Sequence, residues 1–183
     1  WINGHSVATN ENGYLPFRAQ LDRHLKYGEK NVLAVRVDNS RQPNSRWYTG
    51  SGLYRPVLLE VRQPIHISPD SLFIHTAYLY PRTATLEANL AILNETSKTA
   101  SVTVDLHIID PDGFPVITHR EEVESAVREC ATVSVNLPVG NPRLWSPESP
   151  ERYRCVARVF HDGALADRVE IEFGIRTIEF DPE

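Results

Sequence analysis

The segment Thr85-Leu86-Glu87-Ala88-Asn89-Leu90-Ala91-Ile92-Leu93 alternates almost strictly between large or small apolar side chains and more polar positions. Successive side chains of a β-strand point to opposite faces, so the alternation predicts a strand with one buried face. That face would carry Leu86, Ala88, Leu90 and Ile92. Ser101–Ile109 repeats the pattern, with Val102, Val104, Leu106 and Ile108 on one side. The two segments predict a pair of strands over an apolar core.

Further strands are expected on the C-terminal side of this pair and just before it. They are Ser71–Tyr80, Phe114–Ile117, Ala131–Leu137, Arg152–His161 and Leu165–Phe173. Asp110-Pro111-Asp112-Gly113 and Asp162-Gly163 have the composition of tight turns between strands. About seven short strands in about 110 residues are typical of an immunoglobulin-like sandwich. We therefore predict an all-β domain at residues 64–177, and a stiff, proline-containing connector at residues 62–70.

Residues 1–63 show fewer patterns that predict strands or helices. Asn31–Val37 and Leu53–Val61 alternate and predict half-buried strands, and Asn3-Gly4 is a strong signal for a two-residue hairpin turn. Asp22–Gly28 is expected to form at most one helical turn. The N-terminal part is therefore also predicted to be all-β.

Composition and charge exclude several classes of protein. The chain has 183 residues and a net charge of −5. Its basic residues form no stripe, which argues against nucleic acid as a partner. No apolar run approaches the ~20 residues of a membrane helix, so no membrane is expected. The strand phase turns Cys155 inward and leaves Cys130 out of phase, which predicts two free thiols, one of them in the core.

The sequence contains no convincing catalytic or metal-binding motif. Its seven histidines lack the spacing of a zinc site. Asn94-Glu95 lies between two alternating strands and is predicted to be a hairpin tip, although Asn94-Glu95-Thr96 is also a glycosylation sequon. Glu121-Glu122 is expected at a solvated strand edge or loop. Gly50-Ser51-Gly52 lacks the spacing of a nucleophile elbow or a phosphate loop and is expected to be a turn or bulge. We therefore predict no catalytic residue, no metal and no cofactor.

Six phrases of the sequence stand out: Trp1–Gly4, Gly13–Phe17, Asn31–Asn39, Arg46–Val57, Leu144–Pro150 and Phe173–Arg176. Taken in order, they resemble the non-catalytic front part of glycoside hydrolase family 2. The resemblance covers essentially the whole chain. Within the family, Arg46-Trp47-Tyr48 resembles β-galactosidases more than β-glucuronidases or β-mannosidases.

The resemblance implies a domain order. Residues 1–63 would be the C-terminal part of a jelly-roll sugar-binding domain and residues 64–177 an immunoglobulin-like sandwich. Residues 178–183 would begin the connection to a TIM barrel, which this sequence lacks and which carries catalysis in the family. The implied parent reaction is hydrolysis of terminal β-D-galactosides with retention by two carboxylates. The chain itself would be a scaffold, inactive alone, that shapes the edge of the galactose pocket.

The same resemblance implies partners. They are a β-galactoside through the parent enzyme, and the enzyme's own barrel. A partial jelly roll would expose strand edges and an apolar face. We therefore expect residues 1–62 to pack against the second domain, to pair with a second copy as in a homo-oligomer, or to be poorly ordered. Bacterial cytoplasm, periplasm and secretion all remain open as compartments.

Three residues are predicted to contact substrate: Asn44, Arg46 and Trp47. With Tyr48 they bring together the aromatic faces and polar donors that carbohydrate sites use. Alternatively, Trp47 and Tyr48 fill an interface between domains. Trp145 is expected to be a packing anchor. The alternative is that its ring stacks on a sugar. Two other functions stay open for the whole chain, a stand-alone carbohydrate-binding module and an immunoglobulin-like interaction domain.

Overall fold

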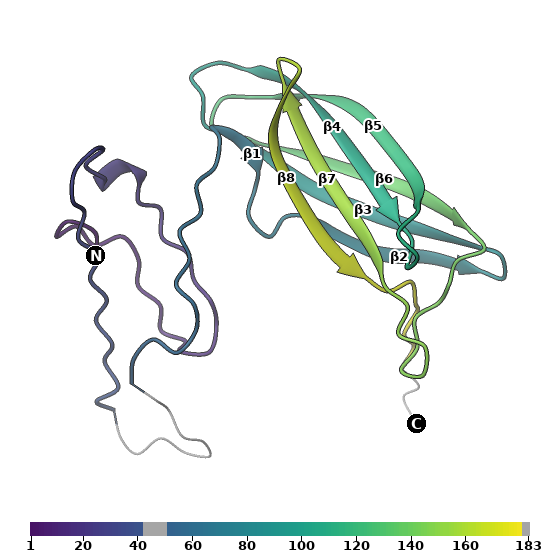
Figure 1. Cartoon of the computed structure of the whole chain (residues 1–183), viewed down its shortest axis with the longest axis horizontal. Coiled ribbons are helices and arrows are strands. Elements are labelled where there is room, and N and C mark those ends of the chain that lie inside the picture. Colours follow the sequence, from purple (N-terminus) through teal and green to yellow (C-terminus); the bar gives the residue numbers. More distant parts are fainter. Residues whose placement is uncertain (42–50, 181–183) are drawn as a thin grey trace. The chain divides into compact units, whose positions relative to one another are not determined.

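The computed structural model describes residues 1–41 and 51–180 of the chain. Contacts within the chain separate two compact units, Trp1–Leu59 and Glu60–Glu183. Figure 1 shows that all the labelled strands belong to the second unit. The first unit contains a 3-10 turn, η1 (Asp22–His24), and otherwise mostly extended chain.

One layer of the second unit is built around its longest strand, β3 (Thr83–Asn94). Along one side, β3 pairs with β6 (Cys130–Gly140). Along the other side, β1 (Ile65–Ile67) pairs with the C-terminal end of β3 and β2 (Phe73–Tyr80) pairs with the remainder. All of these pairings are antiparallel, and β1 and β2 form two pieces of one sheet edge.

The other layer has the strand order β5-β4-β7-β8. Its two central strands are β4 (Ala100–Ile109) and β7 (Tyr153–His161), and its edges are β5 (Pro115–Ser125) and β8 (Ala164–Phe173). Asp162-Gly163 joins β7 to β8 with both residues at positive φ, 50° and 76°, as a two-residue hairpin turn requires. The turn after β4 is closed by Gly113 N donating to Asp110 O at 3.0 Å. Both predicted turns are confirmed.

The core lies between the two layers, and the predicted inward positions are confirmed. Every second residue of β3 is buried along its whole length. Burying one large aliphatic side chain contributes about 1.5–3 kcal/mol, set against the entropy lost on folding. The buried side chains expected from the alternation are Leu86, Ala88, Leu90, Ile92, Val102, Val104, Leu106 and Ile108. Cys155 is buried and Cys130 exposed, and both are free thiols, as predicted.

The prediction of a connector at residues 62–70 is wrong for its central residues, which form strand β1. Ile65, His66 and Ile67 are all buried and pair with the end of β3. Asp167 of β8 fixes this strand to the opposite layer, since its Oδ2 accepts from Ile67 N at 2.9 Å and from Arg62 Nη1 at 3.2 Å. Pro64 and Pro69 flank the strand rather than interrupt it, which is the arrangement that proline permits. The sandwich therefore has eight strands in the described residues.

The strands predicted at Asn31–Val37 and Leu53–Val61 are not formed. In the first segment, one isolated bridge joins Leu33 to Ile2, and the second segment has no ladder among the described residues. The side chains expected on a buried face, such as Val35 and Leu59, are exposed. A strand requires both a hydrogen-bonded neighbour and a layer over its apolar face, and the described part of the first unit supplies neither here. Its assignment to a jelly roll, and a domain boundary at residue 63, stay predictions.

Candidate functional site

The residues predicted to contact substrate, Asn44, Arg46 and Trp47, lie outside the described residues, as does Tyr48. Their role therefore stays a prediction. The chain on either side of them is held together, because Asn39 Nδ2 donates to Ser51 Oγ at 3.2 Å. The two flanks of this predicted rim are thus close in space.

Two of the six phrases meet at Asn3 in the first unit. Asn3 and Gly4 have positive φ and form the predicted hairpin turn, closed by two hydrogen bonds between Ile2 and His5. Asn3 Nδ2 donates to Asn31 Oδ1 at 2.8 Å, and Asn3 Oδ1 accepts from Val32 N at 3.0 Å. One amide side chain therefore joins Trp1–Gly4 to Asn31–Asn39.

Two further phrases meet at Tyr54. Its hydroxyl donates to the carbonyl oxygen of Gly13 at 3.1 Å. Gly13 begins the Gly13–Phe17 phrase, and Tyr54 belongs to Arg46–Val57. The bond brings together segments that are 41 residues apart in the sequence.

The last two phrases meet at Trp145, which follows β6 and contacts the segment that follows β8. Trp145 N donates to Ile175 O at 3.0 Å, and the Arg176 guanidinium carbon lies 4.3 Å from the centre of the Trp145 ring. Ile175 is completely buried, and Arg176 N donates to Thr76 Oγ1 of β2 at 3.2 Å. Trp145 is thus a packing anchor, as expected, and it ties three segments into one unit.

The segment around Trp145 is also fixed through Arg143. Its backbone N donates to the buried Tyr153 hydroxyl at 2.9 Å. Its guanidinium contacts the carboxylates of Glu151 at 2.7 Å and Asp112 at 2.8 Å. These two carboxylates, Glu151 first, raise the pKa of Arg143 further above its ordinary value. Arg143 therefore ties the chain just before Trp145 to Tyr153, Glu151 and Asp112.

An open hollow of about 450 Å³ lies beside this anchor. It is lined by residues 73–76 of β2, Trp145, Arg152, residues 172–174 and Arg176. Glu172 is the carboxylate of this lining, and its Oε2 lies 2.6 Å from Arg152 Nη1. On the same strand, Glu170 contacts Arg168 and Arg154, and these two guanidiniums, Arg168 first, lower the pKa of Glu170. Glu170 and Glu172 of β8 thus both lie in ion pairs with neighbouring arginines.

The structure also places Asn94-Glu95 and Glu121-Glu122, the carboxylate motifs that the sequence did not favour as functional sites. Asn94 is completely buried, and its Nδ2 donates to the carbonyls of Lys98 and Ser125, each at 2.9 Å. An amide used in this way cannot carry a glycan while the hairpin is folded. Glu95 is exposed at the hairpin tip, and Glu121 and Glu122 lie on edge strand β5, as expected.

Neither a metal centre nor a membrane-spanning helix emerges from the part of the chain that the structure describes. No three His, Cys, Asp or Glu side chains there gather closely enough to hold a metal ion. No described helix is long and apolar enough to cross a membrane.

Comparison with known proteins shows what these paired phrases belong to. Residues 65–176 match the pattern of glycosyl hydrolases family 2. The chain belongs to this family. It is 36% identical to the β-galactosidase BoGH2A of Bacteroides ovatus over 99% of its own length and 21% of that protein. The resemblance inferred from the six phrases is thereby confirmed.

Solved structures of family 2 proteins share the fold. A member from Bacteroides cellulosilyticus has a TM-score of 0.92 at 32% identity, covering 98% of this chain and 25% of that one. A β-glucuronidase of Bacteroides uniformis also has a TM-score of 0.92, at 30% identity, covering 99% of this chain and 23% of that one. The chain thus spans about a fifth to a quarter of the length of these family 2 relatives.

Sequence reasoning found the family phrases but missed the hollow between β2 and the Trp145 anchor. The hollow is built from segments that are far apart in the sequence, and no local pattern marks it. The phrases Leu144–Pro150 and Phe173–Arg176 were the available signal, because both border the hollow.

Proposed function

We propose that this chain is the non-catalytic supporting part of a family 2 β-galactosidase, which hydrolyses terminal β-D-galactosides. One observation carries the non-catalytic role. Among the described residues that line the hollow, Glu172 is the single carboxylate, and Arg152 holds it in an ion pair. Retaining glycosidases need two carboxyl groups about 5–5.5 Å apart. The hollow cannot perform that chemistry.

Two observations support a galactoside as the parent substrate. The β-galactosidase BoGH2A is similar to the chain over nearly its whole length. The phrase Arg46-Trp47-Tyr48 resembles that of β-galactosidases. In this proposal Asn44, Arg46 and Trp47 lie at the rim of the sugar pocket, while the catalytic acid/base and nucleophile come from a separate barrel. A β-glucuronidase is the alternative, since relatives with that name also match.

The scaffold role rests on the anchor at Trp145. Ile175 is buried and Arg176 is bound to both Trp145 and Thr76, so the chain leaves the sandwich in a fixed direction. In the proposed enzyme, the catalytic barrel follows that segment. Rigid positioning of this kind keeps a pocket assembled from two domains in register.

The first experiment separates scaffold from catalyst. The 183-residue chain and the proposed whole enzyme are assayed side by side with an aryl β-galactoside and an aryl β-glucuronide. We expect no turnover by the chain, and galactoside turnover by the whole enzyme. Hydrolysis by the pure chain would overturn the scaffold role, and preference for the glucuronide would overturn the substrate.

The rim is tested in the whole enzyme. We expect Arg46→Ala and Trp47→Ala to raise KM for the galactoside more than they lower kcat, because the rim binds substrate without taking part in bond cleavage. Tyr27→Ala is a suitable control, since Tyr27 is an exposed aromatic residue of the same unit. Unchanged KM in both rim variants would remove these residues from the pocket.

A second copy is the further partner that we propose. The first unit exposes many large apolar side chains, among them Val32, Leu33, Val35 and Leu58. Exposed apolar surface of this kind marks an interaction site. Light scattering on the 183-residue chain should show a dimer or larger assembly, and a monomer at every concentration would contradict this proposal.

A further inference from the structure

An aromatic column lies on the outer face of the layer that contains β2, β3 and β6. We define it as Phe73, His75, Tyr78 and Tyr80, all on edge strand β2. The pairing register sets these residues opposite outward-facing positions of β3, namely Asn89, Glu87, Thr85 and Thr83. Phe73, Tyr78 and Tyr80 are 57%, 61% and 60% exposed, and the rings of Phe73 and His75 stack 5.4 Å apart.

A β-bulge creates this column. Thr76 pairs with Leu86 and Tyr78 with Thr85, so Ala77 is an extra residue in β2. In a regular strand, the period of two would turn Tyr78 and Tyr80 toward the core. The extra residue reverses the phase, so that Leu79 packs against the core and both tyrosine rings stay outside. Bulges commonly re-aim side chains beside functional sites.

The column borders a shelf of small and polar side chains. Across the three strands, Phe73 aligns with Asn89 and Ser134, and Tyr78 aligns with Thr85 and Pro138. On the shelf, Asn89 Nδ2 donates to Glu87 Oε1 at 3.0 Å, and His75 Nε2 lies 3.9 Å from Glu87 Oε2. The hollow beside Trp145 opens at the Phe73 end of the column. Aromatic rings, hydroxyls and amides therefore lie side by side on one outer face of the sheet.

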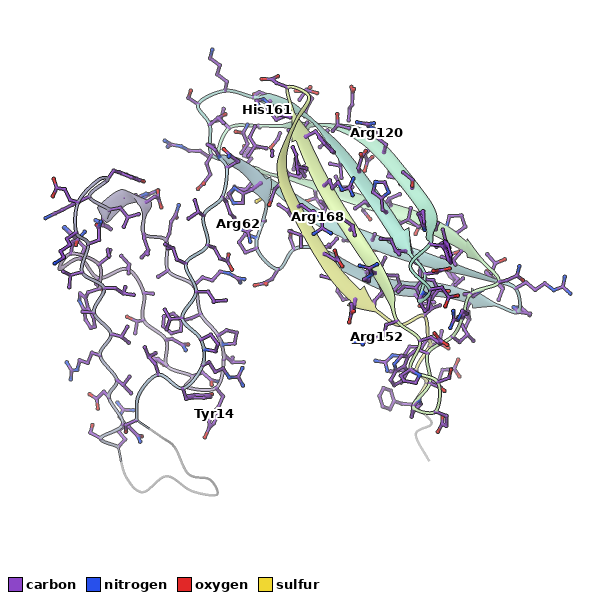
Figure 2. The ribbon with its side chains drawn as sticks, viewed as in Figure 1. Tyr14, Arg62, Arg120, Arg152, His161 and Arg168 are labelled. Carbon is purple, nitrogen blue, oxygen red and sulfur yellow. The ribbon has the colours of Figure 1, made fainter. Side chains whose placement is uncertain are left out.

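Charge distinguishes this face from the opposite one. The outward positions of β2, β3 and β6 include neither Lys nor Arg. On the other layer, the register brings Arg120, Arg158 and Arg168 into one row around Asp105. Figure 2 labels two members of this row, Arg120 and Arg168. In that row Arg120 is paired with Asp105, and Arg168 is paired with Glu170. The aromatic face carries Glu87 and no cationic Lys or Arg, so a neutral ligand matches it better than a polyanion does.

We propose that the aromatic column and its shelf bind a neutral oligosaccharide chain. Sugar rings place their apolar faces on the exposed aromatic rings, and their hydroxyls bond to the amides, hydroxyls and carboxylate of the shelf. This binding site lies on the sandwich and needs no catalytic barrel, so it goes beyond the scaffold role and does not depend on it.

The test uses the 183-residue chain and calorimetric titration with two neutral probes, β-1,4-linked galactotetraose and cellotetraose. An acidic probe, a tetramer of galacturonic acid, is titrated in parallel. We expect at least one neutral probe to bind and the acidic probe to bind more weakly. Failure of both neutral probes at millimolar concentration, or stronger binding of the acidic one, would overturn the proposal.

Variants locate the site. Tyr78→Ala and Tyr80→Ala should each weaken binding of the neutral probe about tenfold, which is a large and easily measured change. Their exposed rings contribute little to folding, and circular dichroism checks that the variants are folded. Tyr27→Ala, an exposed tyrosine of the first unit, is the matched control and should leave binding unchanged. Equal effects of all three variants would contradict the assignment.

NMR chemical-shift mapping on the unaltered chain gives an independent measurement of where the saccharide binds. Amide chemical-shift changes on adding the neutral probe should concentrate in β2 and the facing half of β3. If they fell instead in residues 1–59, the saccharide would belong to the proposed rim, and the aromatic column would be excluded as its site. The two sites, and the two proposals, are thereby distinguished.

Discussion

Trp145 covers Gly174 so closely that a Cβ built on Gly174 would lie 2.7 Å from Trp145 Cβ and 2.8 Å from its Cγ. Neither atom is the flexible end of a side chain, because both are close to the Trp145 backbone. The glycine of the Phe173–Arg176 phrase is therefore required by space. It lets the indole close over the segment that leaves the sandwich.

Replacing this glycine should destabilise the sandwich. We expect Gly174→Ala to lower the free energy of unfolding by about 1–3 kcal/mol, because the added methyl displaces Trp145 and strains the segment. Urea unfolding measures the change. Gly140→Ala is the matched control, because an added Cβ there meets no atom within 4 Å. Equal losses in the two variants would show that the Trp145 contact is not the cause.

A double variant sharpens this test. In Trp145→Gly both the Cβ and the Cγ over Gly174 are absent, so adding Gly174→Ala should cost little more. The two losses should then be clearly less than additive, as expected for residues in direct contact. Full additivity in urea unfolding would contradict a direct clash.

The buried Asn94 amide should be essential for the β3–β4 hairpin. In Asn94→Ala, the carbonyls of Lys98 and Ser125 each lose the amide donor, and Thr96 N loses its acceptor, while the Thr96 hydroxyl still donates to Lys98 O. We expect a loss of about 2–3 kcal/mol in the free energy of unfolding, from buried groups left unpaired. Asn136→Ala, on the outer face of β6, should change it by less than about 0.5 kcal/mol. A small effect at Asn94 would mean that water replaces its bonds.

The ion pairs of Glu170 should make stability depend on acid pH. Arg168 and Arg154 lower the pKa of Glu170 below its ordinary value of 4.5. A carboxylate with a lowered folded-state pKa stabilises the protein above the unfolded-state pKa, and that contribution is lost as pH falls through the folded-state pKa. Glu170→Gln should therefore lower the urea midpoint at pH 7 and have a shrinking effect below about pH 4. Added salt should reduce the difference.

The control for this prediction is Glu124→Gln, an exposed position on edge strand β5. Glu124 has no ion pair among the described residues, so its substitution should leave the acid limb of the stability curve unchanged. Parallel curves for Glu170→Gln and the parent protein would contradict the prediction.

The two thiols should differ in reactivity. Burial raises the pKa of the Cys155 thiol to about 12, while Cys130 is exposed. Because the thiolate is the nucleophile, a thiol reagent at pH 8 should label one cysteine quickly in the folded protein and both in urea. Cys130→Ser should abolish the fast phase. Rapid labelling of two thiols in the folded chain would show that the layer over Cys155 opens readily.

Much of the sandwich was predictable because its signals are local. In β3 and β4, alternation identified the buried face residue by residue, and Asp162-Gly163 and Asp110–Gly113 marked the turns. The same reasoning missed β1, because a strand of three residues is too short to show a period. Its burial comes from the pairing of β1 with β3 and from Asp167, which is about 100 residues away in the chain.

Alternation also predicted strands in Asn31–Val37 and Leu53–Val61 that the described structure does not contain. The pattern reports which side chains could share a face, whereas a strand needs partners supplied by other parts of a chain. The same limit applies to the six family phrases. Each was visible in the sequence, but their meeting in pairs through Asn3, Tyr54 and Trp145 was not.

The amino-acid order was sufficient for the fold class, the family and the inward face of the sandwich, because these follow from side-chain periodicity and from short phrases. The aromatic column, the hollow and the closure of Trp145 over Gly174 required the folded chain. A single extra residue at Ala77 changes the face that Tyr78 and Tyr80 occupy, and it is recognisable only from the pairing of β2 with β3. Local sequence specifies the strands, and their register decides which side chains meet.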